Sequence, residues 1–207
     1  MFENPLLEWL SHVHPATPFV FWLPVAGASF YMGWRSDLSL TAMVWLALSG
    51  LFVWTLVEYG LHRYVFHFTN GGPIVEKIHF YIHGVHHDDP DDETRLVMPL
   101  TASLFLGVLL FVPFYFILGA PWVWPFFGAF LLGYLFYDFT HFSVHAYRDS
   151  GISKTWIGRA WIKNHMIHHY LDPNICWGVS SPFWDIVFGT WLPAREQRSA
   201  DNKHLHV

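Results

Sequence analysis

Long apolar stretches alternate with polar segments along the first two thirds of the chain. Four of these stretches lack any charged residue, namely 18–34, 38–57, 96–120 and 121–137. A transmembrane helix needs about 20 mainly apolar residues, and the second and third stretches meet that requirement. The first is shorter and contains Pro24, which favours a kinked or shallow helix, and Pro121 predicts a tight turn before the fourth. The pattern predicts an all-α integral membrane bundle of about four transmembrane helices.

Composition narrows the class of protein. Hydrophobic residues make up 53% of the 207 residues and charged residues only 13%, well below the ~25% of soluble domains. This balance excludes an intrinsically disordered chain, and the net charge of −5 excludes a basic nucleic-acid binder. The single cysteine, Cys176, excludes a disulfide framework and a zinc site made of several thiolates. A very apolar soluble core is the alternative to a membrane protein.

Charge placement gives the predicted bundle an orientation. With four spans, all but one of the 11 Lys and Arg side chains fall on one side of the membrane, in residues 58–95 and 138–207. Only Arg35 falls on the opposite side. By the positive-inside rule, the side rich in cations is cytoplasmic. The sequence therefore predicts a multi-pass membrane protein with a cytoplasmic helical cap, in a bacterial inner membrane or, in a eukaryote, the endoplasmic reticulum.

Histidine is unusually frequent, with 15 residues against 11 Lys and Arg together. Most of the histidines lie in two clusters, each of which begins where an apolar stretch ends. The first cluster contains His62, His67, His79, His83, His86 and His87. The second contains His141, His145, His165, His168 and His169. The others, His12, His14, His204 and His206, lie in the terminal segments, where we expect them to be solvated.

Helical spacing predicts which histidines share a face. Residues three or four apart are neighbours on a helix surface. The spacing therefore predicts one stripe of His79, His83 and His87, and the further pairs His141 with His145 and His165 with His169. His62 and His67 are five apart at the end of an apolar stretch, where irregular backbone would bring them together.

Adjacent histidines indicate more than one metal ion. The members of His86-His87 and of His168-His169 diverge by about 100° on a helix, so they would reach two metals that lie side by side. Imidazole is a good ligand for iron, zinc, copper and nickel, and the clusters hold far more imidazoles than one tetrahedral zinc ion needs. We therefore expect a dinuclear centre with an almost wholly imidazole ligand set, held by the cytoplasmic cap.

Four other polar side chains are candidates for a catalytic or supporting role. Glu58 precedes His62 by four residues, and Asp138 precedes His141 by three. Because a metal-bound histidine usually donates its other N–H to a carboxylate or carbonyl, both carboxylates are expected to support ligands; simple interfacial charges are the alternative. Tyr134 and Tyr137 are expected to face a substrate channel, unless they belong to the aromatic belt of the membrane interface.

Several motifs carry a resemblance to a known family. They are His62-Arg-Tyr-Val-Phe-His67, His83-Gly-Val-His86-His87, Arg95-Leu-Val-Met-Pro99, His165-Met-Ile-His168-His169 and Gly178-Val-Ser-Ser-Pro-Phe-Trp-Asp185. In this order they resemble the fatty acid hydroxylase branch of the fatty acid hydroxylase/sterol desaturase superfamily, over residues of about 40 to 192. The third and fifth motifs look particularly like those of fatty acid 2-hydroxylases that act on the acyl chain of sphingolipids.

The resemblance implies a ligand set and a reaction. The implied ligands of two iron ions are His62, His67, His83, His86, His87, His141, His145, His165, His168 and His169, with His79 as a further ligand or a supporting group. The implied activity is O₂-dependent 2-hydroxylation of a fatty acid or a (dihydro)ceramide-type lipid, with electrons from outside. Redox-inert zinc would not support it; zinc found in purified protein would be a substitution, because zinc binds more tightly than ferrous iron.

The resemblance also bears on domain organisation. Eukaryotic family members often carry an N-terminal haem-binding cytochrome domain, but only 17 residues precede the first apolar stretch here. We therefore expect residues 1–207 to form a single membrane domain without a fused cytochrome, with the histidine motifs within 58–190 and a separate protein as electron donor.

Other functions stay open at the level of sequence. A sterol desaturase or oxidase, or a carotenoid hydroxylase, would use the same metal chemistry on another lipid. A non-catalytic metal-storage or transport protein would also need histidine clusters. A transporter, however, places polar ligands near the bilayer midplane, and the apolar stretches contain none.

Overall fold

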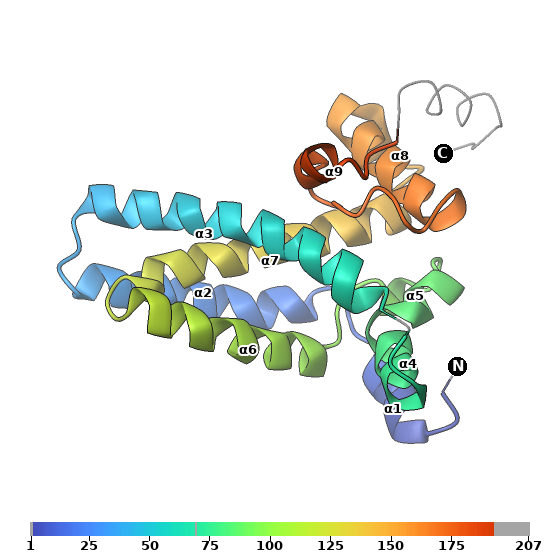
Figure 1. Ribbon diagram of the computed structural model, residues 1–207, viewed down its shortest axis with the longest axis horizontal. Coiled ribbons are helices and arrows are strands. Elements are labelled where there is room, and N and C mark those ends of the chain that lie inside the picture. The colour runs from blue at the N-terminus through green and yellow to red at the C-terminus, as the bar shows by residue number, and fades with distance from the viewer. Residues whose placement is uncertain (1, 69, 193–207) are drawn as a thin grey trace.

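Four long helices form an elongated bundle, and shorter helices cap one of its ends (Figure 1). The computed structural model describes residues 2–68 and 70–192. The bundle consists of α2 (Thr17–Arg35), α3 (Leu40–Leu61), α6 (Leu100–Leu118) and α7 (Val123–Ala146). The cap consists of α1 (Pro5–Ser11), α4 (Pro73–His79), α5 (Val85–Asp88), α8 (Trp156–Tyr170) and α9 (Phe183–Phe188).

Short irregular turns complete the architecture. Two are π-helical, η1 (His62–Phe66) and η2 (Phe80–Gly84), and two are 3₁₀ turns, η3 (Glu93–Arg95) and η4 (Gly151–Lys154). The predicted all-α class is confirmed, since the described residues contain helices and no strand. His204 and His206, and the cations Arg195, Arg198 and Lys203, lie outside the described residues.

Two helical segments are long and apolar enough to cross a membrane by themselves. They are Leu40–Phe66, with a mean hydropathy of 2.0, and Glu93–Leu118, with a mean hydropathy of 2.2. Helices α2 and α7 run alongside these segments in the bundle (Figure 1). The structure therefore supports the second and third predicted spans directly, whereas the first and fourth rest on their place in the bundle.

The outer faces of the bundle are apolar. Phe105, Phe116 and Ile117 on α6 are exposed, and so are Leu48 and Phe52 on α3. Soluble helices carry polar side chains on their outward face, and extended apolar surfaces mark contact with a membrane or another protein. The exposed side chains of α3 and α6 are therefore suited to lipid rather than to water.

Helix α7 lies at the centre of the bundle and is buried along nearly its whole length. Small residues allow this close packing. A Cβ added at Gly50 of α3 would lie 2.1 Å from the carbonyl oxygen of Phe126 on α7, and one at Gly133 of α7 would lie 2.6 Å from the Trp54 ring. The two helices that lead toward the histidines thus approach one another backbone to backbone.

The connections place the histidine segments together. The predicted turn at Gly119-Ala120-Pro121 is present between α6 and α7. This turn and the α2–α3 connection both lie at the end of the bundle opposite the cap (Figure 1). Residues 62–95 and 141–192 consequently gather at the other end, with both histidine clusters among them.

We predict that Gly50→Ala destabilises the bundle. The added methyl group would overlap the Phe126 carbonyl oxygen, and overpacking of this kind costs about 1–3 kcal/mol. Thermal unfolding of the detergent-purified protein measures the effect. Gly27→Ala on α2 is the matched control, because no atom lies within 4 Å of its added Cβ; an equal loss of stability in both variants would contradict the close-packing argument.

Candidate metal centre

Ten histidines form two compact groups at the junction of bundle and cap. In each group of five, the candidate ligand atoms all lie within 4.8 Å of one another. The first group is His62, His67, His83, His87 and His168, and the second is His86, His141, His145, His165 and His169. Each group therefore offers enough nitrogen donors for one metal ion, among the residues that the structure describes.

The adjacent histidines divide between the two groups. His87 belongs to the first group and His86 to the second, while His168 belongs to the first and His169 to the second. This is the division that the helical spacing predicts. The rings of His87 and His169 stack with their centroids 4.1 Å apart, so the two groups touch, as a dinuclear centre requires.

A π-helical turn brings His62 and His67 together. Turn η1 begins at His62 and ends at Phe66, and it brings the two imidazole centroids to 5.1 Å. In a π-helix the hydrogen bonds join residues five apart, so two residues at this spacing come to lie one above the other. Such turns are rare and are often found at functional sites.

His79 lies outside both groups. Its ring centroid is 6.2 Å from that of His67, and its imidazole packs over the backbone of Gly84, where an added Cβ would lie 3.2 Å from it. The predicted stripe assumed a regular α-helix, but turn η2 lies between His79 and His87. The structure thus corrects the predicted stripe and leaves His79 beside the centre.

Backbone carbonyls fix the tautomers of three histidines. Nδ1 of His62 donates to the carbonyl oxygen of Trp177 (2.5 Å), that of His141 to Leu96 (2.7 Å) and that of His168 to Ile175 (2.9 Å). A carbonyl oxygen can only accept a hydrogen bond, so each Nδ1 carries the proton and each Nε2 is left as a bare acceptor. A bare imidazole nitrogen is the form that binds a metal.

Burial and neighbouring imidazoles favour the neutral form of the clustered histidines. Burial, with neighbouring imidazoles acting in the same direction, lowers the pKa of His67 to about 3 and that of His87 to about 2. Burial also lowers the pKa of His168 to about 4. These side chains are therefore uncharged at neutral pH, with lone pairs available for a metal.

The separations between nitrogen atoms fit metal coordination. Two nitrogens bound at about 2.1 Å to one ion, at right angles to each other, lie about 3.0 Å apart. Nε2–Nε2 distances of 3.0–3.2 Å join His62 to His83, His83 to His87, His67 to His168, His86 to His169 and His165 to His169. Every one of these pairs lies within a single group.

Unpartnered nitrogens point to the same conclusion for the second group. Nε2 of His141 and Nε2 of His145 are buried without a hydrogen-bond partner among the described residues. A buried polar atom without a partner is costly. A metal ion that takes up these lone pairs removes the cost, so the residues present fit the metal pair that the motifs imply.

Glu58 supports the centre through a loop and makes no hydrogen bond to a histidine within residues 2–68 and 70–192. Its carboxylate accepts from the backbone N–H of Val179 (2.9 Å) and of Ser180 (2.8 Å), and from the Ser180 hydroxyl. The same loop presents the Trp177 carbonyl to His62. The expected direct pairing with a ligand histidine is thus corrected: the carboxylate holds the loop, and the loop holds the histidine.

Asp138 has the same role on the other side of the centre. Its carboxylate accepts from the backbone N–H of Met98 (3.3 Å) and from the Tyr134 hydroxyl (3.1 Å). The segment that includes Met98 also presents the Leu96 carbonyl to His141. Asp138 therefore orients His141 indirectly, through the backbone of residues 96–98.

Asp185 is a further supporting residue that spacing alone does not reveal. Its carboxylate is fully buried and accepts from the backbone N–H of Trp177 (2.9 Å) and Gly178 (2.7 Å), and from the Thr190 hydroxyl (2.7 Å). It lies far from any histidine along the chain. The motif that ends in Trp184-Asp185 is the sequence signal that contains it.

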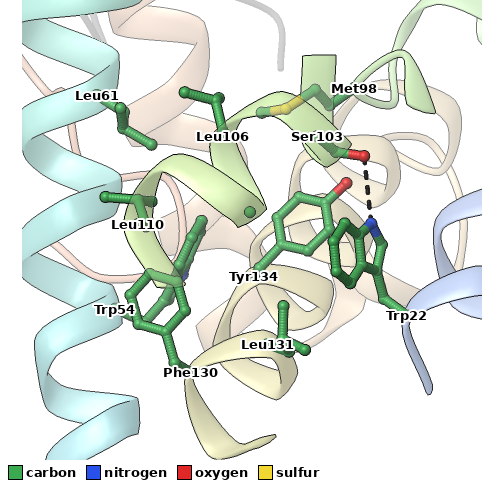
Figure 2. A pocket seen from close by; sticks show the side chains of 11 residues that line it. Trp22, Trp54, Leu61, Met98, Ser103, Leu106, Leu110, Phe130, Leu131 and Tyr134 are labelled. Atoms are coloured by element: carbon green, nitrogen blue, oxygen red, sulfur yellow. Dashed lines mark hydrogen bonds between the residues drawn. The ribbon is translucent and has the colours of Figure 1, made fainter. Parts of the chain in front are cut away.

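Two small cavities, one among the bundle helices and one beside the histidines, have a lining residue in common. The first is lined by Trp22, Trp54, Leu110, Phe130 and Tyr134, among others (Figure 2). The second is lined by His83, His86, His141, Arg95 and Tyr137, among others. Met98 lines both cavities. The apolar space inside the bundle and the space beside the histidines thus lie on either side of Met98.

Each candidate tyrosine lines one of these cavities. Tyr134 lines the apolar cavity, where Figure 2 shows it between Trp54 and Trp22. Tyr137 lines the cavity beside the histidines, and its ring stacks on that of His141 with centroids 5.8 Å apart. Both tyrosines are buried, so their positions fit a channel rather than an aromatic belt.

The fold and the site define a class of protein that comparison identifies. The fatty acid hydroxylase family profile matches residues 45–190, and the chain belongs to that family. It is 41% identical to the ceramide very long chain fatty acid hydroxylase SCS7 of Saccharomyces cerevisiae, over 92% of this chain and 48% of that protein. It is 37% identical to the dihydroceramide fatty acyl 2-hydroxylase FAH1 of Arabidopsis thaliana, over 95% of this chain and 83% of that protein.

A solved structure has the same architecture. The full-length scs7p structure, in which only the hydroxylase domain is visible, superposes with a TM-score of 0.84 and 38% identity, over 93% of this chain and 72% of that one. The chain spans about half the length of the yeast relative SCS7.

We predict that each group of five histidines binds one metal ion. His145→Ala combined with His169→Ala is expected to reduce the metal content from two ions per chain to one, because both residues belong to the second group. Mass-spectrometric metal analysis of purified protein measures the ratio. His79→Ala is the control and should retain both ions. Full retention in the double variant would contradict the assignment.

Proposed function

We propose that this chain is a membrane-bound di-iron hydroxylase that inserts oxygen from O₂ at carbon 2 of the acyl chain of a fatty acid or a (dihydro)ceramide-type lipid. The observation that carries the proposal is the pair of touching five-histidine groups, together with an apolar cavity on the bundle side of Met98. The printed names of the relatives, a ceramide fatty acid hydroxylase and a dihydroceramide fatty acyl 2-hydroxylase, support the choice of substrate.

The histidines would hold two iron ions. An all-imidazole set suits iron as well as zinc, but only a redox-active metal can reduce O₂. Bound iron supplies the oxidising power that an unactivated C–H bond requires, with electrons from a separate donor protein. The chain's own contribution is to keep ten imidazoles neutral and to fix the tautomers of His62, His141 and His168 through backbone carbonyls.

The cavities would position the lipid. The acyl chain lies in the apolar cavity, where Trp22, Leu110 and Phe130 exclude water. Its carboxyl end passes Met98 and reaches the cavity that His86 and His141 line. Holding the chain in this way restricts oxidation to the carbon nearest the histidines, since orientation of the reacting atoms decides the site of attack.

Tyr137 and Asp138 would maintain that geometry. The Tyr137 ring stacks on His141 and forms part of the wall beside the reacting carbon. Asp138 and Tyr134 form a buried hydrogen-bonded pair that ties α7 to the backbone of Met98. Glu58 fixes the loop that begins at Trp177 in the same way.

The arrangement of the bundle helices supports a four-span topology. We infer that α2 and α7 cross the membrane together with the two longest apolar segments, which gives four spans. Both helix connections lie opposite the cap, so the cap and its cations occupy one side, the cytoplasmic side by the positive-inside rule. Residues 58–190 and the bundle would then act as one membrane-embedded hydroxylase unit, in a bacterial inner membrane or the endoplasmic reticulum.

Lipid profiling tests the proposed function. Expression in a host without its own 2-hydroxylase should produce 2-hydroxylated acyl chains, measured by mass spectrometry of hydrolysed lipids. His145→Ala should abolish the product, and His79→Ala should retain it. Altered sterols or carotenoids without 2-hydroxylated acyl chains would overturn the choice of substrate, and metal binding without any lipid product would favour a non-catalytic role.

We predict that filling the apolar cavity shifts the preference for chain length. Leu110→Trp places a larger side chain in the cavity, so product from long acyl chains should fall about tenfold or more relative to short ones, as pocket volume discriminates by this order. Leu109→Trp is the matched control, because Leu109 lies on the exposed face of the same helix. Equal product distributions in both variants would contradict the placement of the acyl chain.

A further inference from the structure

Arg95 is a buried cation beside the metal centre. It ends turn η3, and its side chain is only 4% exposed. It lines the same cavity as His83, His86 and His141. Arginine is almost never fully buried unless it is paired, and here only part of its guanidinium is satisfied by the protein.

The paired side of the guanidinium faces the N-terminal segment. Nη2 donates to the carboxylate of Glu8 (2.5 Å) and lies 2.8 Å from Nε2 of His12. Nε lies 3.0 Å from the carboxylate of Asp92. Helix α1 and turn η3 therefore hold the guanidinium in one orientation.

The remaining nitrogen has no such partner. Nη1 of Arg95 is buried and makes no hydrogen bond to any described residue, although a guanidinium offers donors on every nitrogen. A buried donor without an acceptor costs free energy comparable to a lost hydrogen bond. A buried cationic donor beside a cavity is complementary to an oxygen that carries negative or partial negative charge.

The position of Arg95 is tied to that of a metal-ligand candidate. The next residue, Leu96, accepts a hydrogen bond from His141 through its carbonyl, and Asp138 holds the backbone of Met98. An oxygen atom bound at Arg95 would therefore be held at a fixed distance from the histidines. The apolar tail of the same molecule would continue past Met98 into the bundle cavity.

We propose that Arg95 binds substrate, donating a hydrogen bond from Nη1 to the carbonyl oxygen on carbon 1 of the acyl chain. Carbon 2 is one bond away from that carbonyl carbon, so this contact sets carbon 2 against the histidines and determines which carbon is hydroxylated. The inference rests on the proposed function and adds the residue that recognises the carbonyl end of the acyl chain.

Two variants of Arg95 test the contact in the full-length, metal-loaded protein. Arg95→Gln and Arg95→Lys should raise the KM for an acyl substrate about tenfold to hundredfold, the range for a lost hydrogen bond to a charged group. The share of product hydroxylated at carbon 2 should fall as product at carbon 3 appears, with metal content unchanged. Arg148→Gln is the matched control, because Arg148 is a partly exposed arginine of the cap. A KM within twofold of wild type, with hydroxylation only at carbon 2, would overturn the proposal.

A binding experiment separates this inference from the proposed function. Methyl octadecanoate and methyl octadecyl ether are uncharged probes that differ in the carbonyl oxygen. Wild-type protein should bind the ester at least tenfold more tightly than the ether, and Arg95→Lys, which replaces the guanidinium by a single ammonium, should lose most of this difference. Equal discrimination by both proteins would overturn the role of Arg95 even if the enzyme hydroxylates lipids. Absence of any hydroxylated product from wild type would refute the proposed function while leaving this comparison interpretable.

Discussion

The hydrogen bonds from histidine Nδ1 to backbone carbonyls are the constraint on which the centre depends. They fix the proton of His62, His141 and His168 on Nδ1. Each of these rings therefore presents a bare Nε2 to the centre. Ten imidazoles can share so small a volume only if they are neutral, because protonated neighbours would repel one another. Burial enforces that neutrality, and the carbonyls decide which nitrogen these three rings present.

Two buried carboxylates hold the backbone segments to which two of these carbonyls belong. Glu58 on α3 and Asp138 on α7 each accept from backbone N–H groups of a segment that presents a carbonyl to a histidine. Each carboxylate precedes that histidine by three or four residues, so one continuous segment supplies both the ligand and the anchor of its support. A shift of α3 against α7 would displace both histidines, which links close packing at Gly50 and Gly133 to the geometry of the centre.

The sequence predicts the helical class, the apolar spans that pass the length criterion and the division of His86 from His87, because these depend on helical periodicity. It does not predict the exclusion of His79, since turn η2 breaks that periodicity. Nor does it predict that carbonyls of residues 96, 175 and 177 would support the histidines. A carbonyl has no residue identity, and the Trp177 carbonyl is 115 residues from His62. The roles of Asp185 and of the paired side of Arg95 likewise depend on contacts that only the folded chain reveals.

The division of ligands between bundle and cap has a consequence for folding. The first group joins His62 at the end of α3 to His168 on α8, and the second joins His141 and His145 on α7 to His165 on α8. Neither group can form within the bundle or within the cap alone. A ligand that binds only the native state stabilises it in proportion to its affinity, and metal binding commonly supplies folding free energy. Metal binding at either group would therefore fasten the cap to the bundle.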